Sequence, residues 1–558
     1  MNLKYYLLFV PILIVYLIGM FNDIMEVDAS QYAAMSREMM ETGNYFQLQD
    51  RGTDYLDKPP LLFWVSALSF RLFGISNFTY KLPSVLFSLL GIFATLRLGK
   101  RLYGERAGFY SALILASSQA WFLMNHDVRT DTILAACTIY GIWQLFVFMG
   151  DQKLIHLLGG SLGIAGAMLT KGPVGIMVPA LSIGTYLLVK RDWKNLFNWK
   201  WVLVPIVVAI CISPFLYGLY QQYDLHPGKL IQGVATKSGI QFYLWTQSFG
   251  RITGESVWRD DSTVLFFTHT FLWAFLPWCV LFLVTLWKDT QQLIVSRFKM
   301  ANTEVALTWG GFVFPFIAFS LSNYKLPHYI FVIFPLAAIA TARFIDKLIG
   351  EYSKSSKNTF KSIQFFVALV VYTLGVLLCA WAFPLYNIIY WAIFVVGAGF
   401  TLYFFFQGKN GFETIVLPSL IGIIVLNFLL NIHFYPALSH FASSNRAAKM
   451  IRSLGEVRNL RSLNVRPYGL DVYSLRIIQN YPTLLELITD KKKTNTVWIF
   501  TEENGHREIV NSGLKIIEEK EFEQFHISAL SIPFLNPSTR KKEIGHTYLI
   551  KVEITQTP

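Results

Sequence analysis

Charged residues are scarce in this chain. Asp, Glu, Lys and Arg make up 15% of its 558 residues, whereas hydrophobic residues make up 54%. A soluble domain has roughly 25% charged residues. Repeated apolar runs of about 17–22 residues are each long enough to cross a hydrocarbon core near 30 Å. The composition therefore predicts a polytopic membrane protein, in agreement with the mean hydropathy of +0.43.

Several chemical signatures are missing as well. The sequence contains no nucleotide phosphate loop, no His/Cys cluster with zinc spacing, no internal repeat and no low-complexity segment. A divalent metal stays open as a cofactor, but no residue pattern supports one. The cysteines predict small buried side chains and no disulfide framework, because all four lie inside apolar runs: Cys137, Cys211, Cys279 and Cys379.

The formal net charge is +13. Such an excess suggests a nucleic-acid partner in a soluble protein. Here much of it lies in short loops between apolar runs, where Lys and Arg mark the cytoplasmic side of a membrane. We therefore predict no nucleic-acid partner and read these charges as topological signals, for example at Lys100 with Arg101 and at Lys190 with Arg191.

About thirteen membrane-spanning helices are predicted from the apolar runs. If the N-terminus is cytoplasmic, every cytoplasmic loop is basic. The stretch 61–73 is short and contains Arg71, so we expect a helix lying in the membrane interface, with a short span as the alternative. The predicted spans lie near 5–21, 82–98, 108–124, 131–149, 154–170, 173–189, 201–220, 264–286, 304–321, 329–346, 363–383, 387–407 and 414–433.

The last part of the chain has a different composition. Apolar runs stop after Pro436, helical periodicity appears at 445–454, and β-type runs appear at 496–501 and 547–552. We therefore predict a transmembrane catalytic domain over 1–439, including a first external loop at 22–81, and a soluble α/β domain over 440–558. An odd number of spans places this second domain outside the cytoplasm.

The first external loop carries two groups of candidate residues. Asp28, Tyr32 and Arg37 fit one side of a helix, where Asp28 could be an N-terminal cap or an acid–base group at the membrane surface. Asp57 and Lys58 follow, directly before two prolines that fix the entry into an apolar helix. Lys58 could simply reach the headgroups, or it could hold a lipid phosphate at a fixed depth.

Further polar residues stand at the ends of later spans on the same side. A carboxylate just inside a span requires a partner or a polar cavity, which makes Asp131 a functional candidate, with a salt bridge to Arg129 as the plain alternative. Lys171 lies between two spans and should have an anionic partner, for which Asp28, Asp131 or a ligand phosphate qualifies. His126, His269 and His328 are isolated and favour structural roles.

Two other segments supply cations and a hydroxyl. In the external segment 221–263 only Arg251 stands out as a functional candidate. Lys325 precedes Tyr329 at the start of a span, where Tyr is usually an interfacial anchor. Together with Lys and Arg, a Tyr hydroxyl could also bind phosphate. One mechanism uses this set: Lys58, Arg251 and Tyr329 stabilise a departing lipid phosphate, while a carboxylate deprotonates the acceptor.

These motifs, taken in order, resemble the bacterial protein-mannosyltransferase-like glycosyltransferases, in particular the lipid A aminoarabinose transferases. The resemblance covers residues 1 to about 440. The motifs that carry it are Asp28 after the first span, Lys58-Pro-Pro-Leu-Leu-Phe-Trp, Arg71-Leu-Phe-Gly, Lys81-Leu-Pro-Ser, Arg129-Thr-Asp131, Leu169-Thr-Lys-Gly-Pro173 and Lys325-Leu-Pro-His-Tyr.

The resemblance implies a GT-C fold, a polyprenyl-phosphate-linked sugar donor, inversion at the anomeric carbon and a periplasmic active site in the bacterial inner membrane. Asp28 then matches the family's essential loop carboxylate. Lys58, Arg251 and Tyr329 match groups that hold the lipid phosphate, and Asp131 and Lys171 match cavity residues. The chain departs from the aminoarabinose transferases in having Asp57 where they have Glu, and in lacking a Glu-His pair before Arg251.

The sequence thus predicts a glycosyltransferase that acts on an envelope acceptor such as lipid A, with aminoarabinose as one candidate sugar. Asp28 and Asp131 are the candidate catalytic residues, and the cavity is expected to include Tyr32, Asp57, Lys171 and Lys325. A protein or another glycolipid remains an alternative acceptor. The rival from another class is a transporter, which would place ionisable groups near mid-membrane and would often show repeated halves.

Overall fold

The computed structural model describes residues 3–25, 27–226, 228–231, 234–235, 238–248, 250, 262–299, 302–490 and 496–554. Arg251 lies outside these residues. The chain forms two compact units. Unit 1 comprises Met1–Phe21, Met39–Leu374 and Asn387–Phe428, and unit 2 comprises Asn22–Glu38, Gly375–Tyr386 and Leu429–Pro558.

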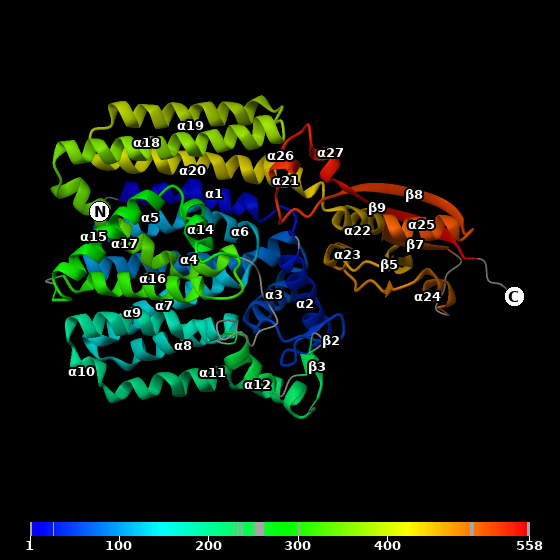
Figure 1. The fold of residues 1–558 in the computed structure, drawn as a ribbon, viewed down its shortest axis with the longest axis horizontal. Coiled ribbons are helices and arrows are strands. Elements are labelled where there is room, and N and C mark those ends of the chain that lie inside the picture. Colours follow the sequence, from blue (N-terminus) through cyan, green and yellow to red (C-terminus); the bar gives the residue numbers. More distant parts are fainter. Residues whose placement is uncertain are drawn as a thin grey trace. The chain divides into compact units, whose positions relative to one another are not determined.

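Unit 1 is built from long apolar helices (Figure 1). Among the described residues, eight helical stretches are long and apolar enough to cross a membrane, or nine if the bent pair α5 and α6 forms one span. The chain is therefore a polytopic helical membrane protein. The main helices are α4 (Asn77–Tyr103), α5 (Glu105–Ala116), α6 (Gln119–His126), α7 (Thr130–Asp151), α8 (Leu154–Lys171), α11 (Leu203–Leu219), α17 (Phe334–Glu351), α18 (Lys354–Val376), α19 (Ile388–Gln407) and α20 (Leu417–Leu429).

Four of the thirteen predicted spans are not among these eight or nine stretches and stay predictions. The additional predicted spans fall on shorter helices: α1 (Phe9–Gly19), α9 (Val174–Lys190), α16 (Glu304–Ser320) and the pair α14 (Phe266–Ala274) and α15 (Cys279–Val295). A helix of 17 residues rises about 26 Å, slightly less than a hydrocarbon core near 30 Å. The apolar runs continue through these helix ends, so the sequence alone does not reveal where each helix stops.

Helix α3 (Leu61–Phe73) occupies the short stretch that was predicted to lie in the interface. It begins directly after Pro59 and Pro60, and its C-cap is Gly74. Its 13 residues rise about 20 Å, too little to cross the hydrocarbon core unaided. Leu72 and Phe73 are exposed at its end. The short length of α3 favours the predicted position in the membrane interface over a short span, and this position stays a prediction.

Unit 2 contains a five-stranded mixed sheet with the order β6-β5-β7-β9-β8. β5 (Leu460–Leu463) is parallel to both β6 (Asn480–Tyr481) and β7 (Thr496–Glu502), whereas β9 (Gly545–Glu553) is antiparallel to β7 and to β8 (Lys515–Gln524). The helix and the two strands predicted from periodicity are confirmed as α22 (Ser443–Ser453), β7 and β9. The other main helices are α23 (Tyr468–Ser474), α24 (Leu484–Thr489) and α25 (Glu503–Asn511).

Alternation along β7 separates the two faces of this sheet. Val497 and Ile499 belong to a buried cluster with Leu484 of α24 and Ile509 of α25. Phe500 therefore points to the opposite face, and it is 1% exposed. The sheet thus has an apolar core on the face covered by α24 and α25 and a second buried layer on the other face.

Helix α2 (Asp28–Thr42) starts within unit 2 and is tied to its helices. The backbone N–H of Ile24 donates to the Tyr473 hydroxyl at 2.7 Å, and the Gln31 amide donates to the Tyr468 hydroxyl at 3.0 Å. Arg37 is 1% exposed and donates to the carbonyl of Asp471. Residues 22–38 thus group with the C-terminal sheet, although they were predicted to belong to the membrane domain. The predicted domain boundary near residue 440 stays a prediction.

Candidate active-site cavity

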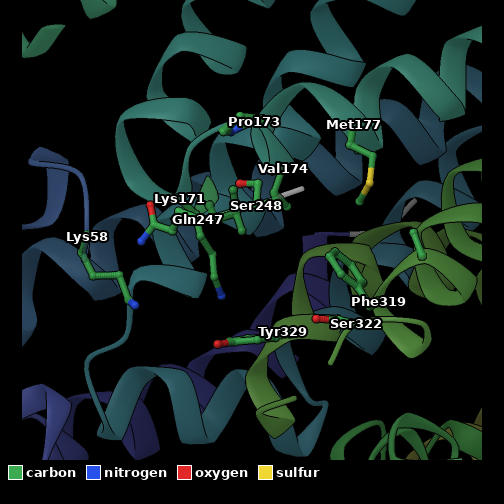
Figure 2. Close-up of a pocket in the computed structure, with 12 residues that line it drawn as sticks. Lys58, Lys171, Pro173, Val174, Met177, Gln247, Ser248, Phe319, Ser322 and Tyr329 are labelled. Carbon is green, nitrogen blue, oxygen red and sulfur yellow. The ribbon is translucent and has the colours of Figure 1, made fainter. Parts of the chain in front are cut away.

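Unit 1 contains a cavity of about 820 Å³, including the part open to solvent, with a polar end and an apolar end. Figure 2 shows Lys58, Lys171 and Tyr329 at one end and Met177 and Phe319 at the other. The polar lining is completed by Gln247, Ser248 and Ser322. The apolar lining is completed by Leu134 of α7, Pro173 and Val174 at the start of α9, and Ala318 of α16.

Lys171 is held between an acid and an aromatic ring. Its Nζ lies 2.6 Å from Oδ1 of Asp131 and 4.0 Å from the centre of the Tyr329 ring. Lys171 ends α8 because Gly172 takes a left-handed conformation at φ 72° and Pro173 follows. Asp131 lies in the first turn of α7 and is 1% exposed. A buried carboxylate needs a partner, and the Lys171 ammonium supplies it.

The two partnerships that the sequence left open are resolved by these contacts. Arg129 does not pair with Asp131; its Nε lies 2.8 Å from a carboxylate oxygen of Asp127. The second oxygen of Asp131 instead faces Nε2 of His328 at 3.6 Å. His328, predicted to be an isolated structural residue, therefore belongs to the surroundings of Asp131.

Lys58 forms a second pair beside the cavity. Its Nζ lies 2.6 Å from Oδ2 of Asp57, and the Gln247 amide donates to the other oxygen of Asp57 at 3.2 Å. The side chains of Lys58 and Asp57 are 14% and 21% exposed. The two prolines before α3 fix the backbone here, so Lys58 presents its ammonium from a rigid segment to the cavity.

The remaining candidates lie elsewhere. Lys325 is 6% exposed and donates to the carbonyl and the hydroxyl of Ser262 at 3.1 and 3.3 Å; it is not among the residues that line this cavity. Asp28 is the first residue of α2 and Tyr32 is buried in the same helix, both within unit 2. Arg251 lies outside the described residues. The roles of these four residues stay predictions.

Sequence reasoning missed Gln247 and Ser248. Both line the cavity, and both follow the aromatic segment η4 (Phe242–Thr246). Neither carries a charge or belongs to a recognisable motif, so the sequence holds no signal that singles them out. Only the fold brings this segment to the turn between α8 and α9. The approach is close there: a Cβ placed on Gly172 would lie 3.4 Å from the carbonyl oxygen of Tyr243.

Asp131 and Asp57 pair with lysines that line this cavity, do not line it themselves, and do not fit a resident metal ion. One oxygen of Asp131 is occupied by the Lys171 ammonium, and Asp57 is occupied by Lys58 and Gln247. Within the described ranges, no group of three or more His, Cys, Asp or Glu side chains is arranged to hold a metal. What the cavity offers is positive charge and hydrogen-bond donors beside an apolar wall, which suits an anionic lipid headgroup.

Comparison with known proteins agrees with this chemistry. The family described as dolichyl-phosphate-mannose-protein mannosyltransferase matches residues 57–217, a range that contains Lys58, Asp131 and Lys171. An uncharacterised protein of Aquifex aeolicus is 26% identical over 492 residues, which cover 85% of this chain and 87% of that protein. The undecaprenyl phosphate-α-4-amino-4-deoxy-L-arabinose arabinosyl transferase of Edwardsiella ictaluri is 26% identical over 59% of this chain and 56% of its own length.

A solved structure matches over nearly the whole chain. The crystal structure of ArnT from Cupriavidus metallidurans bound to undecaprenyl phosphate has a TM-score of 0.76 at 18% identity, covering 99% of this chain and 98% of that one. At this identity the likeness establishes the fold, which is the predicted GT-C fold. This chain thus resembles the protein-mannosyltransferase-like GT-C glycosyltransferases in its motifs, in the family match over residues 57–217 and in its fold.

Proposed function

We propose that this enzyme transfers a sugar from a polyprenyl phosphate to an acceptor of the bacterial envelope. The observation that carries the proposal is the two-ended cavity: cations and a phenol at one end, and apolar side chains of α9 and α16 at the other. A polyprenyl phosphate has the same two-ended chemistry. The ammonium groups of Lys58 and Lys171 and the hydroxyl of Tyr329 receive its phosphate, and Val174, Met177 and Phe319 contact its first isoprene units.

The reaction is a single displacement at the anomeric carbon. The acceptor oxygen attacks from the side opposite the phosphate, the bond between this carbon and the phosphate oxygen breaks, and polyprenyl phosphate leaves with the electron pair. The acceptor's proton passes to a carboxylate, for which Asp28 is the sequence-based candidate. Charge develops on the departing phosphate, so fixed cations stabilise the transition state more than the bound donor. Arg251 is the third cation of this proposal.

Asp131 has a positioning role in this scheme. Its carboxylate is almost fully buried and is engaged by Lys171 and His328, so it is poorly placed to accept a proton from an incoming acceptor. It holds the Lys171 ammonium over the Tyr329 ring instead. This arrangement keeps one positive charge at a fixed point beside the cavity.

The finer substrate assignment is aminoarabinose transfer to lipid A. It is supported by the names of the curated relatives, which are 23–26% identical to this chain, and by the undecaprenyl phosphate bound to ArnT. A protein or another glycolipid is the alternative acceptor, because Asp57 and the missing Glu-His pair depart from the aminoarabinose transferases. We place the cavity and unit 2 on the periplasmic side of the inner membrane, as the basic loops predict.

Mass spectrometry of lipid A, glycolipids and envelope proteins from a strain lacking this gene tests the assignment. The proposal expects one of these acceptors to lose a sugar and to regain it when the wild-type gene is restored. A transporter would instead move a labelled solute into proteoliposomes. Solute uptake together with an unchanged acceptor profile would replace the proposed function with transport.

A further inference from the structure

Unit 2 contains a second cavity, of about 850 Å³ including its open part. It lies at the carboxyl ends of two parallel strands: Asn464 to Tyr468 follow β5, and Phe500 and Glu502 end β7. Ser443 and Ser444 of α22 and the first turn of α2 complete its wall. All of these residues belong to one compact unit.

The strand order explains why a cavity forms there. The connection that leaves β5 runs through α23 to β6 on one side, while the connection that leaves β7 runs through α25 to β8 on the other side. Adjacent parallel strands whose connections diverge leave a crevice outside their carboxyl ends, and α/β proteins bind ligands in such crevices. Asn464, at φ 56°, turns the chain sharply away from β5 and opens the gap.

The lining specifies the chemistry of an occupant. Its polar groups are mainly neutral hydroxyls and amides, together with one cation, Arg466, and one anion, Glu502. These charges cancel, so the site is not built for a polyanion. Tyr468, which is half-buried, adds an aromatic ring, and the buried Phe500 also reaches the lining. Many neutral hydrogen-bonding groups beside aromatic rings match a sugar, which presents both hydroxyls and apolar ring faces.

Hydrogen bonds between the elements that line this cavity fix their relative positions. The Ser443 hydroxyl donates to the Gln524 amide oxygen at 3.1 Å, which ties α22 to β8. The Gln31 amide donates to the Tyr468 hydroxyl at 3.0 Å, which ties α2 to α23. The wall of the site is thus fixed by hydrogen bonds between its elements, as expected of a largely pre-formed ligand site.

We propose that this crevice binds a saccharide, and that the saccharide is part of the acceptor. The second half of this statement rests on the proposed glycosyl transfer; the first half does not. Because α2 carries Asp28 at its start, and the crevice is lined by Val27 directly before this helix and by Ser30 within it, sugar binding here would hold the acceptor next to the candidate base. The C-terminal unit then serves as the acceptor-recognition part of the enzyme.

Binding is tested on the full chain in nanodiscs by saturation-transfer NMR with glucose, mannose, glucosamine, N-acetylglucosamine and inorganic phosphate. We expect at least one sugar to bind, and we expect the double variant Arg466→Ala/Glu502→Ala to weaken it at least tenfold. Both side chains are exposed, so the fold should survive. Lys515→Ala, on exposed β8, is the matched control and should bind normally. Binding of phosphate alone, of none of the sugars, or equally by the double variant overturns the proposal.

The transfer assay then separates the two halves. With the acceptor found by mass spectrometry, the double variant should raise the acceptor KM at least tenfold and leave the donor KM unchanged. If the sugar binds but the acceptor KM does not move, the acceptor assignment is wrong. If wild-type enzyme consumes no polyprenyl-phosphate donor, the proposed function is wrong. The conclusion on sugar binding is unaffected by that result, because the NMR experiment does not use the donor.

Discussion

Lys171 and Asp131, 40 positions apart in the chain, meet at 2.6 Å at one end of the unit 1 cavity. The lysine ammonium is thereby fixed 4.0 Å above the Tyr329 ring. Three helical segments, α7, α8 and the 3-10 helix η5 (Pro327–Ile333), contribute one residue each. This cluster supplies the fixed charge on which the proposed phosphate site depends.

The ion pair predicts strong coupling between its partners. Lys171→Met alone leaves the buried Asp131 without its ammonium partner, which costs about 3–5 kcal/mol of stability. Asp131→Asn combined with Lys171→Met removes both charges and should recover most of this loss. Thermal unfolding of the purified protein, followed by size-exclusion chromatography, measures the difference. Additive effects of the two substitutions would show that the pair is not coupled.

Lys58→Ala should weaken donor binding with little effect on stability, because Lys58 and Asp57 are partly exposed. A charge-assisted hydrogen bond contributes about 1.5–3 kcal/mol, so the donor KM should rise roughly 10- to 150-fold. Lys58→Arg should restore part of the affinity. Lys100→Ala serves as the comparison, since Lys100 is exposed, pairs with Glu105 and does not line the cavity. A donor KM that stays at the wild-type value in Lys58→Ala would remove this residue from the phosphate site.

Asp28→Asn should abolish transfer while leaving donor binding intact. Asn remains a good helix N-cap, so the start of α2 is preserved and only the capacity to accept a proton is lost. Asp23→Asn is the matched control, because Asp23 precedes the same helix and pairs with Lys449 at the surface. Initial rates of sugar transfer and donor binding are measured in parallel. Near-normal turnover in Asp28→Asn contradicts the assignment of Asp28 as the base.

The apolar end of the cavity predicts a dependence on lipid chain length. Phe319→Ala removes an aromatic wall, so a long polyprenyl donor should lose more of its kcat/KM than a donor with a single isoprene unit. We expect the preference for the long donor to fall several-fold. Phe314→Ala, on the same helix but outside the cavity, should keep the wild-type preference. An equal loss for both donors would place the lipid chain elsewhere.

Local patterns predicted much of this architecture. Apolar runs located the helices, and period-two alternation located β7 and β9, because these signals depend only on neighbouring residues. Lys58, Lys171 and Tyr329 were each singled out from the sequence because each is a polar residue at the end of an apolar run, and all three line one cavity. A charged residue next to a long apolar run is informative because its burial must be compensated.

Contacts between distant segments could not be predicted. Arg129 was the local candidate for Asp131, yet it pairs with Asp127, and Lys171 takes the buried carboxylate. Residues 22–38 join the C-terminal sheet through contacts between residues far apart in the chain, such as the hydrogen bond from Gln31 to Tyr468, and no local pattern marks these contacts. Four of the predicted spans stay predictions, because apolar composition continues where the backbone breaks, as it does between α14 and α15.

The central claim is that Lys58 and Lys171 hold a lipid phosphate, and competition binding tests it most directly. Undecaprenyl phosphate and undecaprenol share a chain and differ only in the anion. In nanodiscs, wild-type enzyme should prefer undecaprenyl phosphate at least tenfold, and Lys58→Ala/Lys171→Met/Asp131→Asn, which leaves no buried charge unpaired at Asp131, should lose that preference. A triple variant that is folded and still discriminates between the two lipids as wild type does would contradict the account.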